Sequence, residues 1–132
     1  KTCLLIVVSL MISSKAFMQT KTFTYLALGD SYTIGESVPM SKNFPNQTAA
    51  LLKKAGIKME TPTIIAKTGW TTDELQEQLS RTRLAGPFDF VTLLIGVNNQ
   101  YRGRSSEEYA QQFEELLQQA IGYAGGNINH VI

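Results

Sequence analysis

The amino-acid sequence predicts an α/β fold, in the form of a three-layer α/β/α sandwich with a mainly parallel sheet. Three observations carry this prediction. Short β-branched or apolar segments alternate with longer amphipathic ones, in the order β-α-β-α-β-α-β. Segment 90–95 (FVTLLI) is apolar almost throughout, which is typical of a strand covered by helices on both faces. A chain of 132 residues is long enough for one such domain and too short for two.

The first half of the chain predicts two strands around one helix. The first strand is expected over 22–28 (TFTYLAL), which is β-branched, aromatic and apolar and ends abruptly at Gly29. A helix is expected over Pro45–Ala55, because proline suits the first turn and Gly56 suits the residue just after a helix end. Thr63–Ala66 (TIIA) is expected to be a short buried strand.

The second half predicts two helices around the apolar strand 90–95. Thr71 and Glu74 have the spacing of a capping box, so a helix is expected to start there. Ser105 and Glu108 repeat that spacing ahead of an apolar stripe at helical period, which predicts the longest helix. Residues 127–132 are expected to begin a fourth strand, and the crossovers between parallel strands to be right-handed.

Composition excludes several classes of protein. Twelve Lys+Arg against eleven Asp+Glu give a net charge of +1, without the basic excess that nucleic-acid binders usually show. One cysteine, Cys3, excludes an internal disulfide, and together with the single histidine, His130, it is too little for a Cys/His zinc site. We therefore expect no nucleic-acid partner, no metal and no cofactor.

The start of the chain is typical of an export signal. Lys1 precedes the apolar run Leu4–Ile12, and Ser14-x-Ala16 would allow cleavage after Ala16. The run is shorter than the roughly 20 residues that span a bilayer, so no stable membrane span is expected. A buried first strand is the other interpretation, but the strand at 22–28 already fills that place. We expect residues 1–20 to be a leader, 21–132 the domain, and the protein to be periplasmic or extracellular.

Unusual loops follow the three predicted strands: Gly29–Glu36, Lys67–Thr72 and Gly96–Gln100. Ligands of parallel α/β sheets bind at the carboxyl ends of the strands, so these loops are expected to meet at one edge. Each loop taken alone is an ordinary turn. A flavodoxin-like nucleotide binder is disfavoured, because the first loop lacks the Gly-Lys-Ser/Thr ending that holds phosphates.

Together, these loops resemble the sequence blocks of the SGNH, or GDSL, hydrolases. The matching residues are Gly29-Asp30-Ser31-Tyr32-Thr33-x-Gly35, Gly69 and Gly96-x-Asn98. The resemblance implies a serine hydrolase that cleaves carboxylic esters through an acyl-enzyme, with Ser31 as the nucleophile. It also implies an oxyanion hole formed by the backbone N–H groups of Ser31 and Gly69 and the Asn98 amide, supported by Gly29, Asp30 and Gly96. The implied substrate is a small acyl ester, either a lipid or an acylated carbohydrate.

Two departures from the family pattern affect the predicted activity. Asn99 stands where the family usually has aspartate, and we expect this change at most to loosen the loop that carries Asn98, since it removes no oxyanion donor. The family's Asp-x-x-His block has no match in the chain. His130 precedes the predicted fourth strand, which puts it about 16 Å from Ser31 at the amino edge, too far for a general base.

The missing block leaves two functional readings. In the first, the chain is the amino-terminal part of a longer esterase, incomplete at its C-terminus, whose catalytic Asp and His lie beyond residue 132; the 132 residues alone are then inactive. In the second, the chain is a non-catalytic α/β binding module that keeps the pocket without the triad. Near the site, Trp70 is expected to pack over the second helix, and Arg102 and Arg104 to be solvated loop charges rather than contacts for an anionic substrate.

Overall fold

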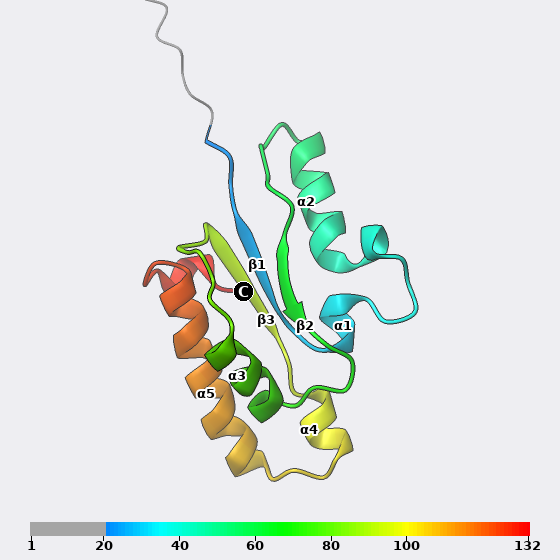
Figure 1. Ribbon diagram of the computed structural model, residues 1–132, viewed down its shortest axis with the longest axis vertical. Coiled ribbons are helices and arrows are strands. Elements are labelled where there is room, and N and C mark those ends of the chain that lie inside the picture. Colours follow the sequence, from blue (N-terminus) through cyan, green and yellow to red (C-terminus); the bar gives the residue numbers. More distant parts are fainter. Residues whose placement is uncertain (1–20) are drawn as a thin grey trace, which may run out of the picture.

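The computed structural model describes residues 21–132 and confirms the α/β fold (Figure 1). Three parallel strands form the sheet, in the order β2-β1-β3. They are β1 (Tyr25–Gly29), β2 (Thr63–Ala66) and β3 (Phe90–Leu94). The expected leader, residues 1–20, lies outside the described residues, so export stays a prediction.

The three expected helices are present, and shorter ones accompany them. The helices are α1 (Ser31–Ile34), η1 (Met40–Lys42), α2 (Phe44–Lys54), α3 (Thr72–Arg81), α4 (Val97–Tyr101), α5 (Ser106–Tyr123) and η2 (Ile128–His130). The single-turn helices α1 and α4 were not expected; they follow β1 and β3 directly, inside the loops singled out above. In the described part of the chain, no helix is long and apolar enough to cross a membrane.

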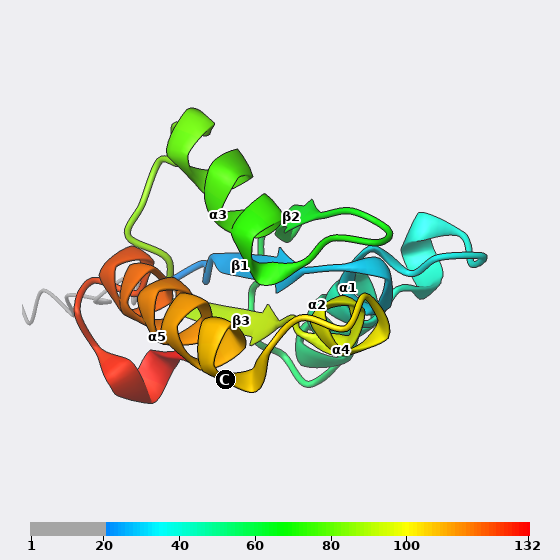
Figure 2. The same ribbon diagram turned by 90° about the horizontal axis from the view of Figure 1, so that it is seen from below.

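The sheet is covered by α3 and α5 on one face and by α2 on the other (Figure 2). Strand β1 is buried along its whole length because its alternate side chains enter both layers. Leu26 and Leu28 pack in a cluster with residues of α3 and α5, whereas Tyr25 and Ala27 pack in a cluster with Ala49 of α2. This arrangement is the predicted three-layer sandwich.

Strand β3 is less buried than its sequence suggested. Val91 is fully buried against α5, but Leu94 is 47% exposed. Phe90 packs in the α2 cluster and stacks on Tyr25 with ring centroids 4.2 Å apart, whereas Leu94 lies four residues further on, past that cluster. β3 is therefore covered on both faces at its amino end but not at Leu94, whereas β1, at the centre of the sheet, is buried along its whole length.

The register aligns the carboxyl ends of all three strands. Gly29, the last residue of β1, pairs with Ala66 of β2 and with Leu94 of β3, which are also the last residues of their strands. The three loops therefore leave the sheet at one edge, as predicted. At the opposite edge Val131 pairs in parallel with Val91, so the expected fourth strand begins beside β3.

Candidate active site

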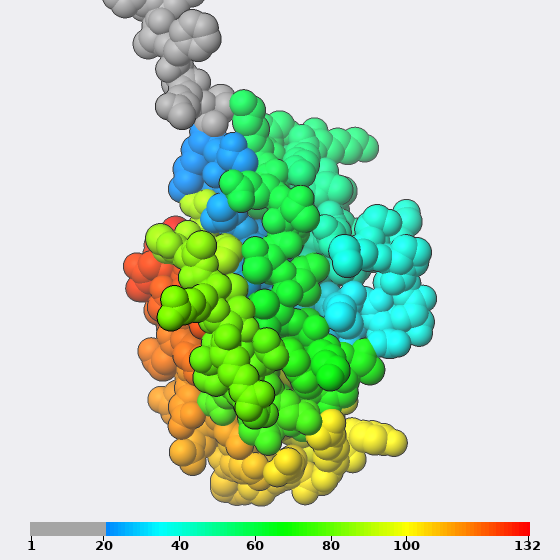
Figure 3. Space-filling model, viewed as in Figure 1, coloured from blue at the N-terminus to red at the C-terminus, as the bar shows by residue number. Residues whose placement is uncertain are grey.

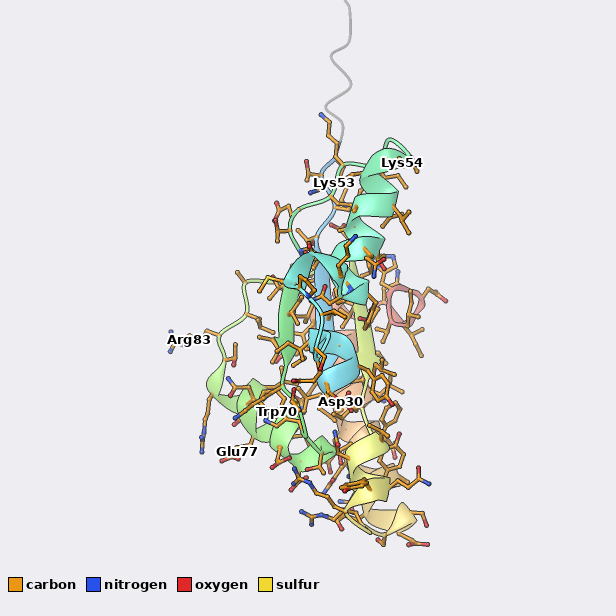
Figure 4. The ribbon with its side chains drawn as sticks, turned by 90° about the vertical axis from the view of Figure 1, so that its right-hand side faces the viewer. Asp30, Lys53, Lys54, Trp70, Glu77 and Arg83 are labelled. Atoms are coloured by element: carbon orange, nitrogen blue, oxygen red, sulfur yellow. The ribbon has the colours of Figure 1, made fainter. Side chains whose placement is uncertain are left out.

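The side chain of Asn98 connects all three loops at the carboxyl edge. Its Nδ2 donates to the backbone oxygen of Trp70 at 2.9 Å, and the same nitrogen lies 3.4 Å from Oδ2 of Asp30. Figure 4 shows Asp30 and Trp70 next to each other where the strands end. Ser31 follows Asp30 and Gly69 precedes Trp70, so the predicted site residues of the three loops gather around one carboxamide.

Ser31 is the first residue of α1, and Asp30 caps that helix. Oδ1 of Asp30 accepts a hydrogen bond from the backbone N–H of Tyr32 at 3.0 Å. The N–H at the first helical position has no partner within the helix, so the N–H of Ser31 is free to serve another acceptor. The backbone oxygen of Ser31 accepts from the N–H groups of Gly35 and Glu36, both at 3.0 Å, which folds the chain back on itself after one turn.

Asp30 is almost completely buried, with 1% of its surface exposed. Burial raises the pKa of its carboxyl above the ordinary value, and the hydrogen bond from the Tyr32 backbone opposes that rise. Its two oxygens face the Tyr32 N–H and the Asn98 amide. Asp30 therefore connects the start of α1 to the loop after β3.

Gly69 has a φ of +84°, a conformation that glycine adopts without steric cost. Its carbonyl oxygen accepts a hydrogen bond from Nη2 of Arg102 at 2.6 Å, and Nη1 of the same guanidinium lies 3.3 Å from Oε1 of Glu74. Arg104 is also paired, with Asp73 at 3.6 Å and with Glu108 at 3.3 Å. Both arginines therefore bind the protein itself and are not simply solvated charges.

Asn99 does not loosen its loop, contrary to the expectation from the sequence. Its side chain is buried, with Oδ1 accepting from the backbone N–H of Thr72 at 3.1 Å. Its Nδ2 donates to the Thr72 hydroxyl at 2.7 Å. A carboxamide supplies the donor for this second bond, which an ionised carboxylate does not have. Asn99 thus attaches α4 to the start of α3 and fixes the loop that presents Asn98.

Two hollows of about 400 Å³ each lie on either side of the three loops. One is lined by residues of α4 and the start of α5, among them Gly96, Gln100 and Tyr109. The other lies between Ile64 and Ala66 of β2 and the segment 34–43, which projects from the molecule in Figure 3. Most of its lining is apolar: Ile34, Val38, Met40, Ile64 and Ala66.

The remaining predicted residues fall away from this centre. His130 is exposed and immediately precedes Val131, whose partner Val91 is near the amino end of β3, so the structure places His130 at the opposite edge from Ser31. Trp70 packs against the core cluster that includes Leu75 and Leu79 of α3, and Lys67 is exposed. Within residues 21–132, no group of three His, Cys, Asp or Glu side chains is arranged to hold a metal ion.

Sequence reasoning missed the contacts of Arg102 and Asn99. Their partners, Gly69 and Thr72, lie 33 and 27 residues away in the chain, and no periodic pattern signals such pairs. A signal for the apolar hollow was present, because Ile34, Val38 and Met40 follow Ser31 within ten residues, in a stretch for which the sequence predicted neither helix nor strand. Large apolar side chains in a loop are a reason to look for a binding surface.

Comparison with known proteins identifies one family. The sequence matches the profile of the GDSL-like lipase/acylhydrolase family over residues 27–128. No curated relative matches the chain.

Several solved structures share the fold. The SGNH-hydrolase family esterase AlinE4 is 22% identical, with a TM-score of 0.66 over 75% of this chain and 53% of its own. TesA is 18% identical, with a TM-score of 0.68 over 79% of this chain and 56% of its own. The psychrotrophic esterase EstA from Pseudoalteromonas sp. is 14% identical, with a TM-score of 0.67 over 77% and 55%. The chain thus matches about half the length of each structure.

The family profile covers residues 27–128, which is most of the chain. The chain therefore belongs to the GDSL-like lipase/acylhydrolase family.

Proposed function

We propose that this chain carries the nucleophile and the oxyanion hole of a serine esterase. Oγ of Ser31 attacks the ester carbonyl carbon, the C–O bond to the alcohol breaks, and water then hydrolyses the acyl-enzyme. The backbone N–H groups of Ser31 and Gly69 and the Asn98 amide stabilise the oxyanion. Preorganised donors of this kind stabilise the charge that develops on the tetrahedral intermediate.

The bonding of Asn98 is the observation that carries the proposal. Its Nδ2 is anchored on the Trp70 carbonyl at 2.9 Å, whereas the contact to Asp30 is long, at 3.4 Å. A substrate oxygen can take over the second N–H without disturbing the first. The amide is thus held by the bond to Trp70, and the longer bond to Asp30 is the one that we propose a substrate oxyanion replaces.

The general base is proposed to lie outside these 132 residues. A serine hydroxyl is a weak nucleophile until a base within about 3 Å removes its proton. His130 is the single histidine of the sequence and stands at the far edge of the sheet. Since the chain matches about half of each solved structure, we expect the whole protein to supply the His and the Asp that orients it.

For the substrate, we propose an ester whose acyl part is an apolar chain. The hollow beside β2 supports this proposal, because it is lined mainly by aliphatic side chains. One of them, Ile34, lies one turn after Ser31 on α1, so the two side chains share a face of that helix. An acyl chain that leaves the Ser31 ester toward this face would meet an apolar surface.

The test is p-nitrophenyl acetate hydrolysis and labelling by a fluorophosphonate in the whole protein. The Pseudoalteromonas esterase was solved inhibited by monoethylphosphonate, so a phosphonate probe suits the fold. Ser31→Ala should abolish labelling and lower hydrolysis by several orders of magnitude, as loss of a nucleophile does. His130→Ala should leave both nearly unchanged. A Ser31→Ala protein that still hydrolyses the ester at the parental rate would refute the proposal.

A binding module without turnover is the second candidate, and the position of His130 favours it for the 132 residues taken alone. The oxyanion donors by themselves leave a residual acceleration of roughly a thousandfold over water. The chain alone should therefore hydrolyse p-nitrophenyl acetate at no more than this residual rate, far below that of the whole protein, while still binding an apolar ester. If the whole protein behaved in the same way, the binding module would be the better description.

A further inference from the structure

We propose that Arg102 is a positioning residue for the oxyanion hole: its guanidinium holds the Gly69 loop at a fixed distance from Asn98. The inference rests on the proposed function, in which the Gly69 N–H and the Asn98 amide bind one substrate oxygen. Neither the family resemblance nor the sequence pattern pointed to this arginine, which was expected to be a solvated charge. Its contacts in the structure assign the role.

Arg102 connects the middle of the segment between β2 and α3 to the first turn of α3. Nη2 donates to the Gly69 carbonyl at 2.6 Å, and Nη1 is 3.3 Å from the Glu74 carboxylate. Glu74 in turn accepts from the backbone N–H of Thr71 at 2.9 Å. Hydrogen bonds with an ionised partner are about twice as strong as neutral ones, so one guanidinium anchors a loop that has no regular structure of its own.

The geometry of α4 explains why this anchor matters for catalysis. Arg102 caps the C-terminus of α4, and its backbone N–H bonds the Asn98 carbonyl at 2.9 Å. The two residues are four apart, so their side chains leave the same face of the helix turn. Asn98 donates to the Trp70 carbonyl and Arg102 to the Gly69 carbonyl, which precedes it. One turn of helix therefore hydrogen-bonds to two successive carbonyls, and this fixes the Gly69 N–H relative to the Asn98 amide.

Arginine suits this position better than lysine. Its planar fork reaches two acceptors at once in a fixed geometry, whereas an ammonium on a flexible stem does not fix both. Catalytic donors have to be held within about 0.5 Å of the productive geometry to act on one oxygen. The Arg102 side chain is 42% exposed, and exposed ion pairs add little to stability. Its replacement should therefore disturb the loop without unfolding the domain.

The experiment compares Arg102→Ala with Arg104→Ala in the whole protein. Arg104 is a matched control, because it is equally exposed and forms ion pairs but has no contact with the Gly69 loop. Two measurements are made: backbone amide exchange over residues 67–71, and steady-state kinetics that give kcat and KM for p-nitrophenyl acetate. Arg102→Ala should speed exchange several-fold. It should lower kcat by about tenfold to a hundredfold, which does not exceed the loss caused by removing a whole oxyanion donor. KM should stay within about twofold of the parental value.

Arg104→Ala should change neither the exchange nor the kinetics, and Arg102→Lys should restore only part of kcat. Unchanged exchange in Arg102→Ala would overturn the claim that the arginine holds the loop. If Arg102→Ala showed faster exchange but the same kcat as Arg104→Ala, the claim that the ordered loop serves the reaction would be overturned. Failure of the proposed function looks different: the unsubstituted protein would then be as inactive as Ser31→Ala, and exchange alone would decide whether Arg102 orders the loop.

Discussion

At the scale of single residues, the site depends on close approaches that only glycine permits. A Cβ on Gly29 would overlap the Thr33 hydroxyl and the Leu94 carbonyl, both of which sit against the turn into Ser31. A Cβ on Gly96 would lie 2.6 Å from the Tyr109 ring, at a φ of +134°. The first and third sequence blocks therefore need their glycines for packing, whatever chemistry follows.

Gly29→Ala should destabilise the domain by about 1–3 kcal/mol, the usual cost of overpacking. Gly122→Ala is the matched control, because Gly122 lies within α5 with no neighbouring atom near its missing Cβ. Gly122→Ala should raise the free energy of unfolding by about 0.5–1 kcal/mol, since glycine destabilises a helix relative to alanine. Urea unfolding of both variants measures the difference. Equal stability of the two variants would show that the turn at Gly29 has room to adjust.

The residues that sequence reasoning identified and those that it missed differ in a physical way. Gly29, Ser31, Gly69 and Asn98 stand in short local patterns, each tied to a strand end, so their shared edge followed from topology. The contacts of Arg102 and Asn99 join loops that are distant in sequence. Their side chains have several possible partners in a sequence, and only the folded chain selects one.

At the scale of elements, the start of α3 combines a cap with an ion pair. Glu74 accepts hydrogen bonds from the backbone N–H of Thr71 and from its hydroxyl, and it faces Arg102. The hydrogen bond from the Thr71 backbone is the main cause that holds the pKa of Glu74 below its ordinary value of 4.5. A carboxyl whose pKa is lowered by folding stabilises the fold above its unfolded pKa and loses that contribution as the pH falls through its folded pKa.

Glu74→Gln should therefore lower stability at pH 7, and the difference from the unsubstituted protein should shrink as the pH falls below about 4.5. The loss should stay under about 1 kcal/mol, because the side chain is more than a third exposed and glutamine keeps part of the cap. Thermal unfolding from pH 3 to pH 7 follows the change. Glu77→Gln, which removes the same charge from α3 outside the cap together with an exposed ion pair to Arg81, is the control for the change of charge itself.

The elements that were predicted well are those with a long pattern or an explicit cap. Helices α2, α3 and α5 begin within about one residue of their predicted starts, which is the ordinary uncertainty of helix ends. The single turns α1 and α4 were missed because four or five residues are too short to show a helical period. Burial of β3 was overestimated because apolarity alone does not tell a central strand from a less covered one.

At the scale of the whole molecule, the sheet register turns three separate sequence blocks into one site. Gly29 pairs with the last residues of both neighbouring strands, so the loops start level with one another. The same register puts His130 at the opposite edge. Topology thus predicted which residues meet and which do not. The leader at 1–20 and the proposed general base lie outside the described residues and stay predictions.

The hollow beside β2 gives the last prediction, on the length of the acyl chain. Val38, which is 48% exposed, lines this hollow together with Ile34 and Ala66. Val38→Trp should fill it, and since each buried methylene contributes about 0.8 kcal/mol, kcat/KM for p-nitrophenyl octanoate should fall by at least tenfold. We expect kcat/KM for p-nitrophenyl acetate to stay unchanged, because a single methyl group is too short to fill the hollow. Leu51→Trp, at an exposed apolar position on α2, is the control. If Val38→Trp lowered kcat/KM equally for both esters, the acyl chain would bind elsewhere, although Ser31 would remain the nucleophile.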